Sequence, residues 1–158
     1  MKLTLLSLRG AMTAGLLVGF GAAPAVAGTC PAGKAGIDVM KPSDAPASGV
    51  TDTVLSSIDL AKEPVAVDGR MLRLRRLTVA PGGVVPYHSH GNRPAIIHVV
   101  SGTITEYAST CAVPIVHKAG ESVAELNKTS HWWRNTGKVP VVLLASDFFP
   151  VDGDPKAM

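Results

Sequence analysis

The sequence of 158 residues lacks the features that would suit it to nucleic acid, to a membrane or to a helical fold. No run of basic residues interleaved with aromatic ones is present, although such a run is the usual mark of a nucleic-acid surface. The apolar stretch from Ala11 to Ala23 is shorter than the roughly 20 residues that a membrane-spanning helix needs. Beyond this N-terminal segment we find no internal repeat and no long stretch with helical periodicity. These absences leave a β-rich domain without nucleic-acid or membrane partners.

The N-terminal segment has the composition of a secretory signal peptide. Lys2 and Arg9 are basic, the short apolar stretch follows, and the Ala-Val-Ala sequence at 25–27 offers a cleavage site. We expect residues 1–27 to be removed and the mature chain to be periplasmic or secreted. An uncleaved anchor helix or lipidation at Cys30 fits the segment less well. Without the leader the basic residues fall from 15 to 13 against 12 acidic ones, so the net charge falls from +3 to +1.

Cysteine is scarce, with Cys30 and Cys111 as the only two in the chain. Outside the cytoplasm such a pair can form a disulfide. The bridge would close a loop of about eighty residues, worth roughly 4–5 kcal/mol in the chain-entropy model. It would also tie the N-terminal arm to the domain. Two free thiols are the alternative, because the sequence does not reveal how closely the two Cα atoms approach.

The remaining pattern predicts one all-β domain. Residues 28–52 are rich in Pro, Gly, Ala and Ser and predict an extended arm, residues 53–150 form the domain, and residues 151–158 form a tail. Turn signals such as Pro81-Gly82-Gly83 and Ser101-Gly102 separate short apolar stretches. The expected strands are 54–60, 71–79, 85–90, 95–100, 103–107, 115–118, 121–124, 131–135 and 139–148. Many short strands with regular turns are typical of a β-sandwich or a small antiparallel barrel.

Three histidines are spaced to share one metal ion. His88 and His90 are two positions apart on a predicted strand, so their side chains point to the same face. His131 follows about forty residues later on another predicted strand. Neutral imidazole is a good ligand for Zn, Fe, Cu and Ni. The pattern predicts a metal site inside the barrel; three histidines bonded to one another and to water, without a metal, are the alternative.

The spacing of these residues resembles that of the cupin family. Its first motif is G-x5-H-x-H-x3-4-E-x6-G, matched by Gly82, His88, His90 and Gly102. Its second motif is G-x5-P-x-G-x2-H-x3-N, in which Gly120, His131 and Asn135 stand at the right spacings. The resemblance covers roughly residues 53–150 and implies a small single-domain cupin, a double-stranded β-helix or jelly roll.

The sequence departs from the cupin pattern at the fourth ligand. The motif's glutamate position holds Ala95, while Leu126 and Lys128 replace the second motif's proline and glycine in the turn before His131. Three histidines alone form a neutral shell with positions open to water, substrate or dioxygen. Some cupin dioxygenases use three histidines. The resemblance therefore implies one divalent transition metal, Fe(II) before Mn, Ni, Zn or Cu, in a dioxygenase-type oxidoreductase that acts on a small organic molecule.

Two other functions share the same ligand set. A cupin that carries a metal or small ligand for sensing or storage needs the same histidines. An isomerase or lyase would use the metal as a Lewis acid only. Because this fold hosts many activities, the resemblance does not separate these alternatives.

Four further residues are candidates for the pocket. Trp133 and Asn135 share the face of His131, so Trp133 could form a pocket wall or pack in the core, and Asn135 could steady the strand or orient a ligand. Glu106 could reach the metal or act as a base, although a solvated position at a strand end is the ordinary expectation. Arg93 lies in the loop after His90 and could meet an acidic substrate, with a surface position as the default.

No chemistry is assigned to the other histidines or to the cluster of arginines. We expect His98 to face away from the ligand set, and His117 to be structural or exposed beside a turn. A homodimer formed through the first strand, 54–60, is also expected. The arginine cluster should be a solvated strand face rather than an anion site; its members are Arg70, Arg73, Arg75 and Arg76.

Overall fold

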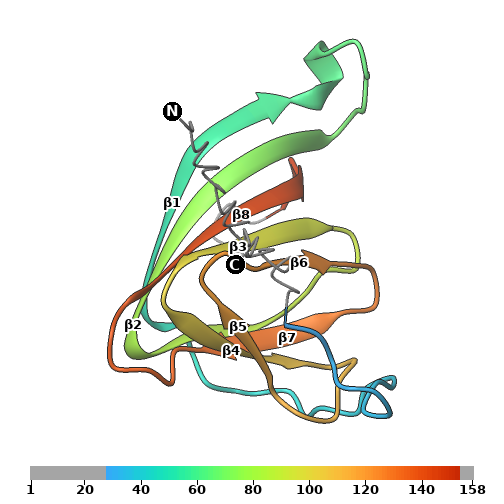
Figure 1. Cartoon of the computed structure of the whole chain (residues 1–158). Coiled ribbons are helices and arrows are strands. Elements are labelled where there is room, and N and C mark those ends of the chain that lie inside the picture. Colours follow the sequence, from blue (N-terminus) through green and yellow to red (C-terminus); the bar gives the residue numbers. More distant parts are fainter. Residues whose placement is uncertain (1–27, 154–158) are drawn as a thin grey trace, which may run out of the picture.

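Antiparallel β-strands make up almost all of the regular structure in residues 28–153, the part of the chain that the computed structural model describes (Figure 1). The predicted signal peptide and the end of the predicted tail lie outside the described residues. Within them, no helix has the length and apolar character needed to cross a membrane. The elements are β1 (Ser48–Asp59), the 3-10 helix η1 (Leu60–Lys62), β2 (Arg70–Ser89), β3 (Ala95–Ser101), β4 (Thr103–Ala108), β5 (Ile115–Lys118), β6 (Ser122–Glu125), β7 (Ser130–Arg134) and β8 (Val141–Pro150).

The strands form one sheet that curls into a nearly closed barrel. Their order is β5-β4-β7-β2-β8-β3-β6, with β1 paired to β2 outside this path. The first part of β2 pairs with β8, and its last part pairs with β7. Strand β2 therefore belongs to both sides of the barrel, with β1 beside it on the outside (Figure 1). The prediction of an all-β antiparallel barrel is confirmed.

Strand β2 corrects one detail of the predicted strands. The sequence predicts two strands separated by a turn at 81–83, whereas the structure has one strand of 20 residues. Gly82 adopts a positive φ of 77°, and a Cβ on Gly83 would lie 2.9 Å from the carbonyl oxygen of Ala80. Only glycines tolerate this conformation and this close approach without strain. They bend the strand where its partner changes from β8 to β7, so the chain turns without leaving the sheet.

The barrel core follows the alternation of inward and outward residues that a strand imposes. Along β8 every second residue from Val141 to Phe149 is buried, and the buried residues of β2 include Leu77 and Val79. With Trp133 and Ile104 these residues fill the interior.

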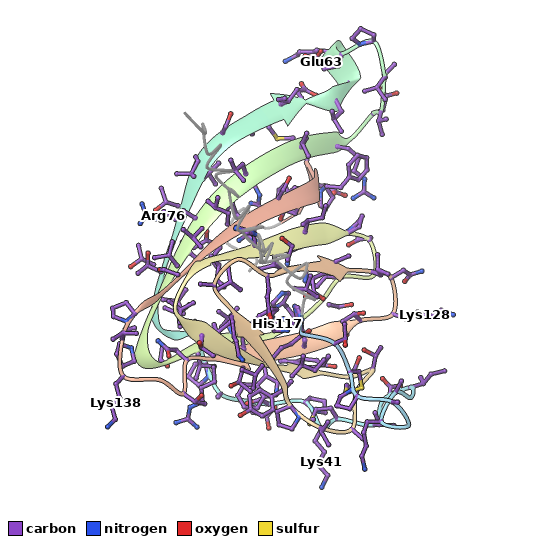
Figure 2. All side chains as sticks on the ribbon, viewed as in Figure 1. Lys41, Glu63, Arg76, His117, Lys128 and Lys138 are labelled. Carbon is purple, nitrogen blue, oxygen red and sulfur yellow. A yellow bond between two sulfur atoms is a disulfide. The ribbon has the colours of Figure 1, made fainter. Side chains whose placement is uncertain are left out.

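Two arginines continue the inward face of β2 toward one end of the barrel. Arg73 and Arg75 are in phase with Leu77 and are each 4% exposed. The guanidinium of Arg73 donates two hydrogen bonds to Asp147 on β8, at 3.0 and 2.7 Å. The expected solvated face is therefore wrong for Arg73 and Arg75, because carboxylate partners inside the barrel compensate for their burial. Arg76 is exposed, as expected for the other face (Figure 2).

The N-terminal arm is fastened to the barrel by a disulfide. Cys30 and Cys111 are bonded, with their Cα atoms 5.7 Å apart, which confirms the predicted pairing. The arm also makes backbone hydrogen bonds to the loop after β4, including Gly36 N–H to the Thr110 carbonyl. Strand β1 begins at Ser48, so the last residues of the predicted arm belong to the sheet.

Candidate metal centre

The three predicted histidines converge inside one end of the barrel. His88 on β2 and His131 on β7 are direct partners in the antiparallel register, and His90 lies one residue beyond the end of β2. Their Nε2 atoms form a triangle with all three sides at 3.1 Å. His90 and His131 are buried, whereas His88 is partly exposed. The structure thus brings together a group that could hold a metal ion.

The opposite nitrogen of each ring fixes how the imidazole is protonated. His88 Nδ1 lies 2.9 Å from the carbonyl oxygen of Pro86, and His90 Nδ1 lies 2.8 Å from that of Arg93. His131 Nδ1 lies 2.7 Å from a carboxylate oxygen of Glu106. Because these oxygens accept hydrogen bonds, each Nδ1 is the donor. In a neutral ring the lone pair then belongs to Nε2, the atom that faces the other two rings.

A cation at the centre of this triangle would satisfy the converging nitrogens. Burial lowers the pKa of His88 to about 2 and the pKa of His90 to about 4, so both rings are neutral at neutral pH. Their Nε2 lone pairs point toward the same small space. A proton on His131 Nε2 could serve only one of these acceptors well, whereas a metal ion can bind all three. The residues present therefore fit a transition metal.

Glu106 holds His131 in place from behind. Its carboxylate accepts hydrogen bonds from His131 Nδ1 at 2.7 Å and from His117 Nε2 at 2.8 Å. Burial opposes ionisation, but these two hydrogen bonds lower the pKa of Glu106 well below its usual range. The expected solvated strand end is wrong, because β4 lies between β5 and β7 and turns this side chain inward. Glu106 contacts Nδ1 rather than the Nε2 triangle, so it orients a ligand instead of joining the ligand set.

Two residues of this network were not among the predicted site residues. His117 is 1% exposed and lies inside the barrel, where Figure 2 labels it, so of the two expected roles the structural one holds and the exposed one does not. Glu125 on β6 places Oε2 3.4 Å from His131 Nδ1, and its Oε1 has no hydrogen-bond partner within the part of the chain that the structure describes. Burial and the charge of Glu106 raise the pKa of Glu125 to about 9. Glu125 is therefore a neutral acid beside the ionised Glu106.

Ala95 stands between two carboxyl groups, neither of which replaces the motif's glutamate. In the sheet register its partners are Glu125 on β6 and Asp147 on β8. Asp147 is engaged by arginines, with Arg73 at 2.7 Å and Arg75 at 3.6 Å. Glu125 approaches the Nδ1 side of His131. Among the described residues, the group formed around the Nε2 triangle therefore contains histidines only.

A small cavity of about 30 Å³ lies against the three histidines. One water needs about 10–15 Å³ by this measure, so the cavity has room for about two. Trp133 forms part of its wall, with the indole N–H against the His131 ring, 3.1 Å from Nδ1. The full lining is Arg75, Leu77, Val85, His88, His90, Ile97, His131, Trp133, Leu143 and Ala145. The cavity is thus mostly apolar.

The other predicted pocket residues lie near this cavity but not on its wall. Asn135 is fully buried and donates to the carbonyl oxygens of Val79 and Val139, at 2.9 and 2.8 Å, so it steadies the strand ends. Arg93 is 5% exposed rather than on the surface, because its guanidinium lies 3.5 Å from Asp147. His98 faces away from the ligand set, as expected, and bonds to Ser122 at 2.8 Å.

Comparison with known proteins agrees with this architecture. A model of the family described as "Cupin domain" matches residues 75–147. Auxin-binding protein ABP19b from Prunus persica is 31% identical over 90 residues, which cover 55% of this chain and 43% of that protein. The chain thus spans less than half the length of this curated relative.

Solved structures share the fold at low sequence identity. The cupin domain of an XRE-family transcriptional regulator from Enterobacter cloacae has a TM-score of 0.51 at 14% identity, covering 65% of this chain and 99% of that one. An oxalate oxidase in complex with the substrate analogue glycolate has a TM-score of 0.50 at 24% identity, covering 66% of this chain and 53% of that one. These likenesses show the fold alone. The family model, the matched motifs and the barrel together show that this chain contains a cupin domain.

Proposed function

We propose that this protein is a metal-dependent oxidoreductase of the dioxygenase type, which acts on a small organic molecule at the three-histidine centre. One observation carries the proposal: three Nε2 atoms converge at 3.1 Å, while each Nδ1 is fixed as a donor by an oxygen acceptor. Such a shell contributes no charge and occupies only three positions around an ion. Further positions are left for water, substrate or dioxygen.

Iron(II) is the metal we propose first, with manganese, nickel, zinc and copper as the other members of the class. The three Nε2 atoms lie 3.1 Å from one another, close enough to bind one ion together, and imidazole is a good ligand for all of these metals. When bound, a redox metal of this kind would supply Lewis acidity and electron transfer for chemistry with dioxygen.

The chain's own residues would hold and shield this centre. Glu106 keeps the proton of His131 on Nδ1, and thus keeps Nε2 available. Val85, Ile97 and Leu143 give the cavity apolar walls that exclude bulk water. Trp133 packs edge-on against His131, with ring planes at 78°, and limits rotation of that imidazole. These contacts would preorganise the site before a substrate enters.

A non-catalytic cupin that carries a metal is the second candidate, and the size of the cavity favours it. A volume of about 30 Å³ leaves room for only the head of a substrate beside the ion. A storage or sensing protein needs no more space than that. A Lewis-acid isomerase or lyase is a third candidate that uses the same ligands.

Oxygen uptake by the iron-loaded protein separates these functions. We would screen small organic acids, thiols and diketones in an oxygen electrode, with product detection by mass spectrometry. The His88→Ala variant removes a ligand, whereas His98→Ala removes an imidazole that faces away from the site. Uptake that is lost in His88→Ala and retained in His98→Ala would support the oxidoreductase. Product formation without oxygen uptake would support an isomerase or lyase, and turnover of no compound would favour the binder.

We also propose that the protein is exported, cleaved after Ala27 and homodimeric. The disulfide is compatible with an oxidising compartment, and Gly28 N lies 3.1 Å from a carboxylate oxygen of Glu121, which would receive a new N-terminal amine. For the dimer, the supporting observation is that, among the described strands, β1 pairs with β2 alone and exposes Val54 and Leu55. N-terminal sequencing of the secreted protein and light scattering test these two proposals.

A further inference from the structure

We propose that Arg75 is an anion-binding residue of the site, and that the cavity takes the carboxylate group of a small organic acid between this guanidinium and the metal. The inference rests on the proposed metal centre and adds the chemical class of the substrate. It starts from a property of the cavity wall. Nine of the ten lining residues are imidazoles or apolar side chains, and Arg75 is the tenth.

Arg75 has a hydrogen-bond donor to spare. Its Nη1 pairs with Asp52, and its Nη2 lies 3.6 Å from Asp147, a carboxylate that Arg73 already approaches at 2.7 Å. Its Nε is buried and has no hydrogen-bond partner among residues 28–153. An unpaired buried donor is costly, so an acceptor that arrives with a ligand would be bound favourably. A carboxylate is the natural acceptor, since the guanidinium edge matches its geometry.

The charge of the cavity selects an anion. None of the described carboxylates lines it, because Ala95 occupies the motif's glutamate position and Glu106 lies behind His131. A divalent ion held by three neutral imidazoles would keep its full charge of two, and Arg75, whose own charge is balanced by Asp52, would add a directed N–H donor. In an apolar cavity the ion and this donor interact strongly with an incoming anion. A neutral molecule of the same shape would gain much less from the same position.

The size of the cavity limits which anion can enter. Room for about two waters matches the two oxygens of one carboxylate group. The rest of the molecule would extend toward His88, the least buried of the three ligands. The residues that would hold the substrate are therefore Arg75, the metal and the apolar wall.

Calorimetry with acetate, the probe we would use, tests this inference on both the metal-loaded and the metal-free protein. Acetamide serves as the neutral molecule of the same shape. Arg75→Lys keeps a positive charge for Asp52 but removes the Nε donor, and Arg73→Lys makes the same change one inward position away, where the side chain does not line the cavity. Metal content and circular dichroism are measured first, so that lost metal or lost folding is seen directly.

We expect acetate to bind the metal-loaded wild-type protein at least about tenfold more tightly than acetamide binds the same protein. We also expect acetate to bind wild type about tenfold more tightly than it binds the Arg75→Lys variant. Arg73→Lys should stay within about twofold of wild type. Equal acetate affinity in wild type and Arg75→Lys, or no acetate binding in a protein that holds its metal, overturns the inference and leaves the metal proposal intact. If no metal binds, the proposed function fails by itself. In that case the titration of the metal-free protein tests the anion site alone. Acetate binding that is weaker in Arg75→Lys than in wild type would support the anion site, and no acetate binding to wild type would refute it.

Discussion

Replacing Glu106 by glutamine should weaken metal binding although Glu106 is not a ligand. The carboxylate accepts from two ring N–H groups, of His131 at 2.7 Å and of His117 at 2.8 Å. Glutamine has one accepting oxygen, and its amide N–H₂ would face the other ring as a second donor. One ring must then lose its partner or move its proton to the opposite nitrogen. If His131 does so, its Nε2 is no longer a ligand.

The expected size of this effect follows from the contacts that are lost. A hydrogen bond to a charged group contributes about 1.5–3 kcal/mol, and changes at groups that orient metal ligands reduce metal affinity by about 10–100-fold. We expect Glu106→Gln to bind zinc about 10–100-fold more weakly than wild type, measured by competition with a chromogenic chelator at neutral pH.

Glu125→Gln is the matched control for this experiment. Its carboxyl also approaches His131 Nδ1, at 3.4 Å, but it is neutral because burial raises its pKa. Glutamine therefore removes no charge there, and the zinc affinity should stay within about threefold of wild type. Wild-type affinity in Glu106→Gln, or an equal loss in both variants, would refute the proposed role of Glu106 in fixing the proton of His131.

Three further changes test other parts of the structure. Glu125 has a raised pKa, so the folded protein holds a proton that the unfolded chain releases. The free energy of unfolding should therefore fall by up to about 1.4 kcal/mol per pH unit between about pH 7 and pH 9. Urea denaturation of the metal-free protein measures this slope, which should be smaller in Glu125→Gln. A wild-type slope equal to that of the variant would contradict this. Replacing Cys30 and Cys111 by serine opens a loop spanning 81 positions and should cost about 2–5 kcal/mol in the same assay, without loss of metal; an unchanged midpoint would show that the bridge adds nothing. Asn135→Ala leaves the buried Val79 carbonyl and the part-buried Val139 carbonyl without their donor and should cost about 1–3 kcal/mol with metal content unchanged, whereas loss of metal would give Asn135 a role in the site.

The histidine cluster was predictable because its evidence is local in the sequence. Spacing by two places His88 and His90 on one face of a strand, and the resemblance to the cupin motifs adds His131. The strands were predicted for a similar reason, since apolar stretches and turn residues mark them. The prediction that a turn at Gly82 ends the strand was wrong, because a pair of glycines can bend a strand as well as end it.

The residues behind the ligands could not be predicted in the same way. Burial of Glu106 and Glu125 depends on how β4 and β6 are registered against β7 and β3, and no residue in either strand reveals that register. The buried arginines are a different case. Arg73 and Arg75 are in phase with Leu77 on β2, so the alternation of the strand contained the signal, but charged residues are normally assigned to the surface.

Metal analysis of the purified protein tests the central claim most directly. Wild type, His88→Ala and His98→Ala would be purified from the compartment to which the protein is exported. Their metal contents would then be compared by inductively coupled plasma mass spectrometry. A redox metal near one ion per chain in wild type and in His98→Ala, and its loss in His88→Ala, is the result that the three-histidine centre predicts. No metal in folded wild type, or an equal metal content in His88→Ala, would contradict it.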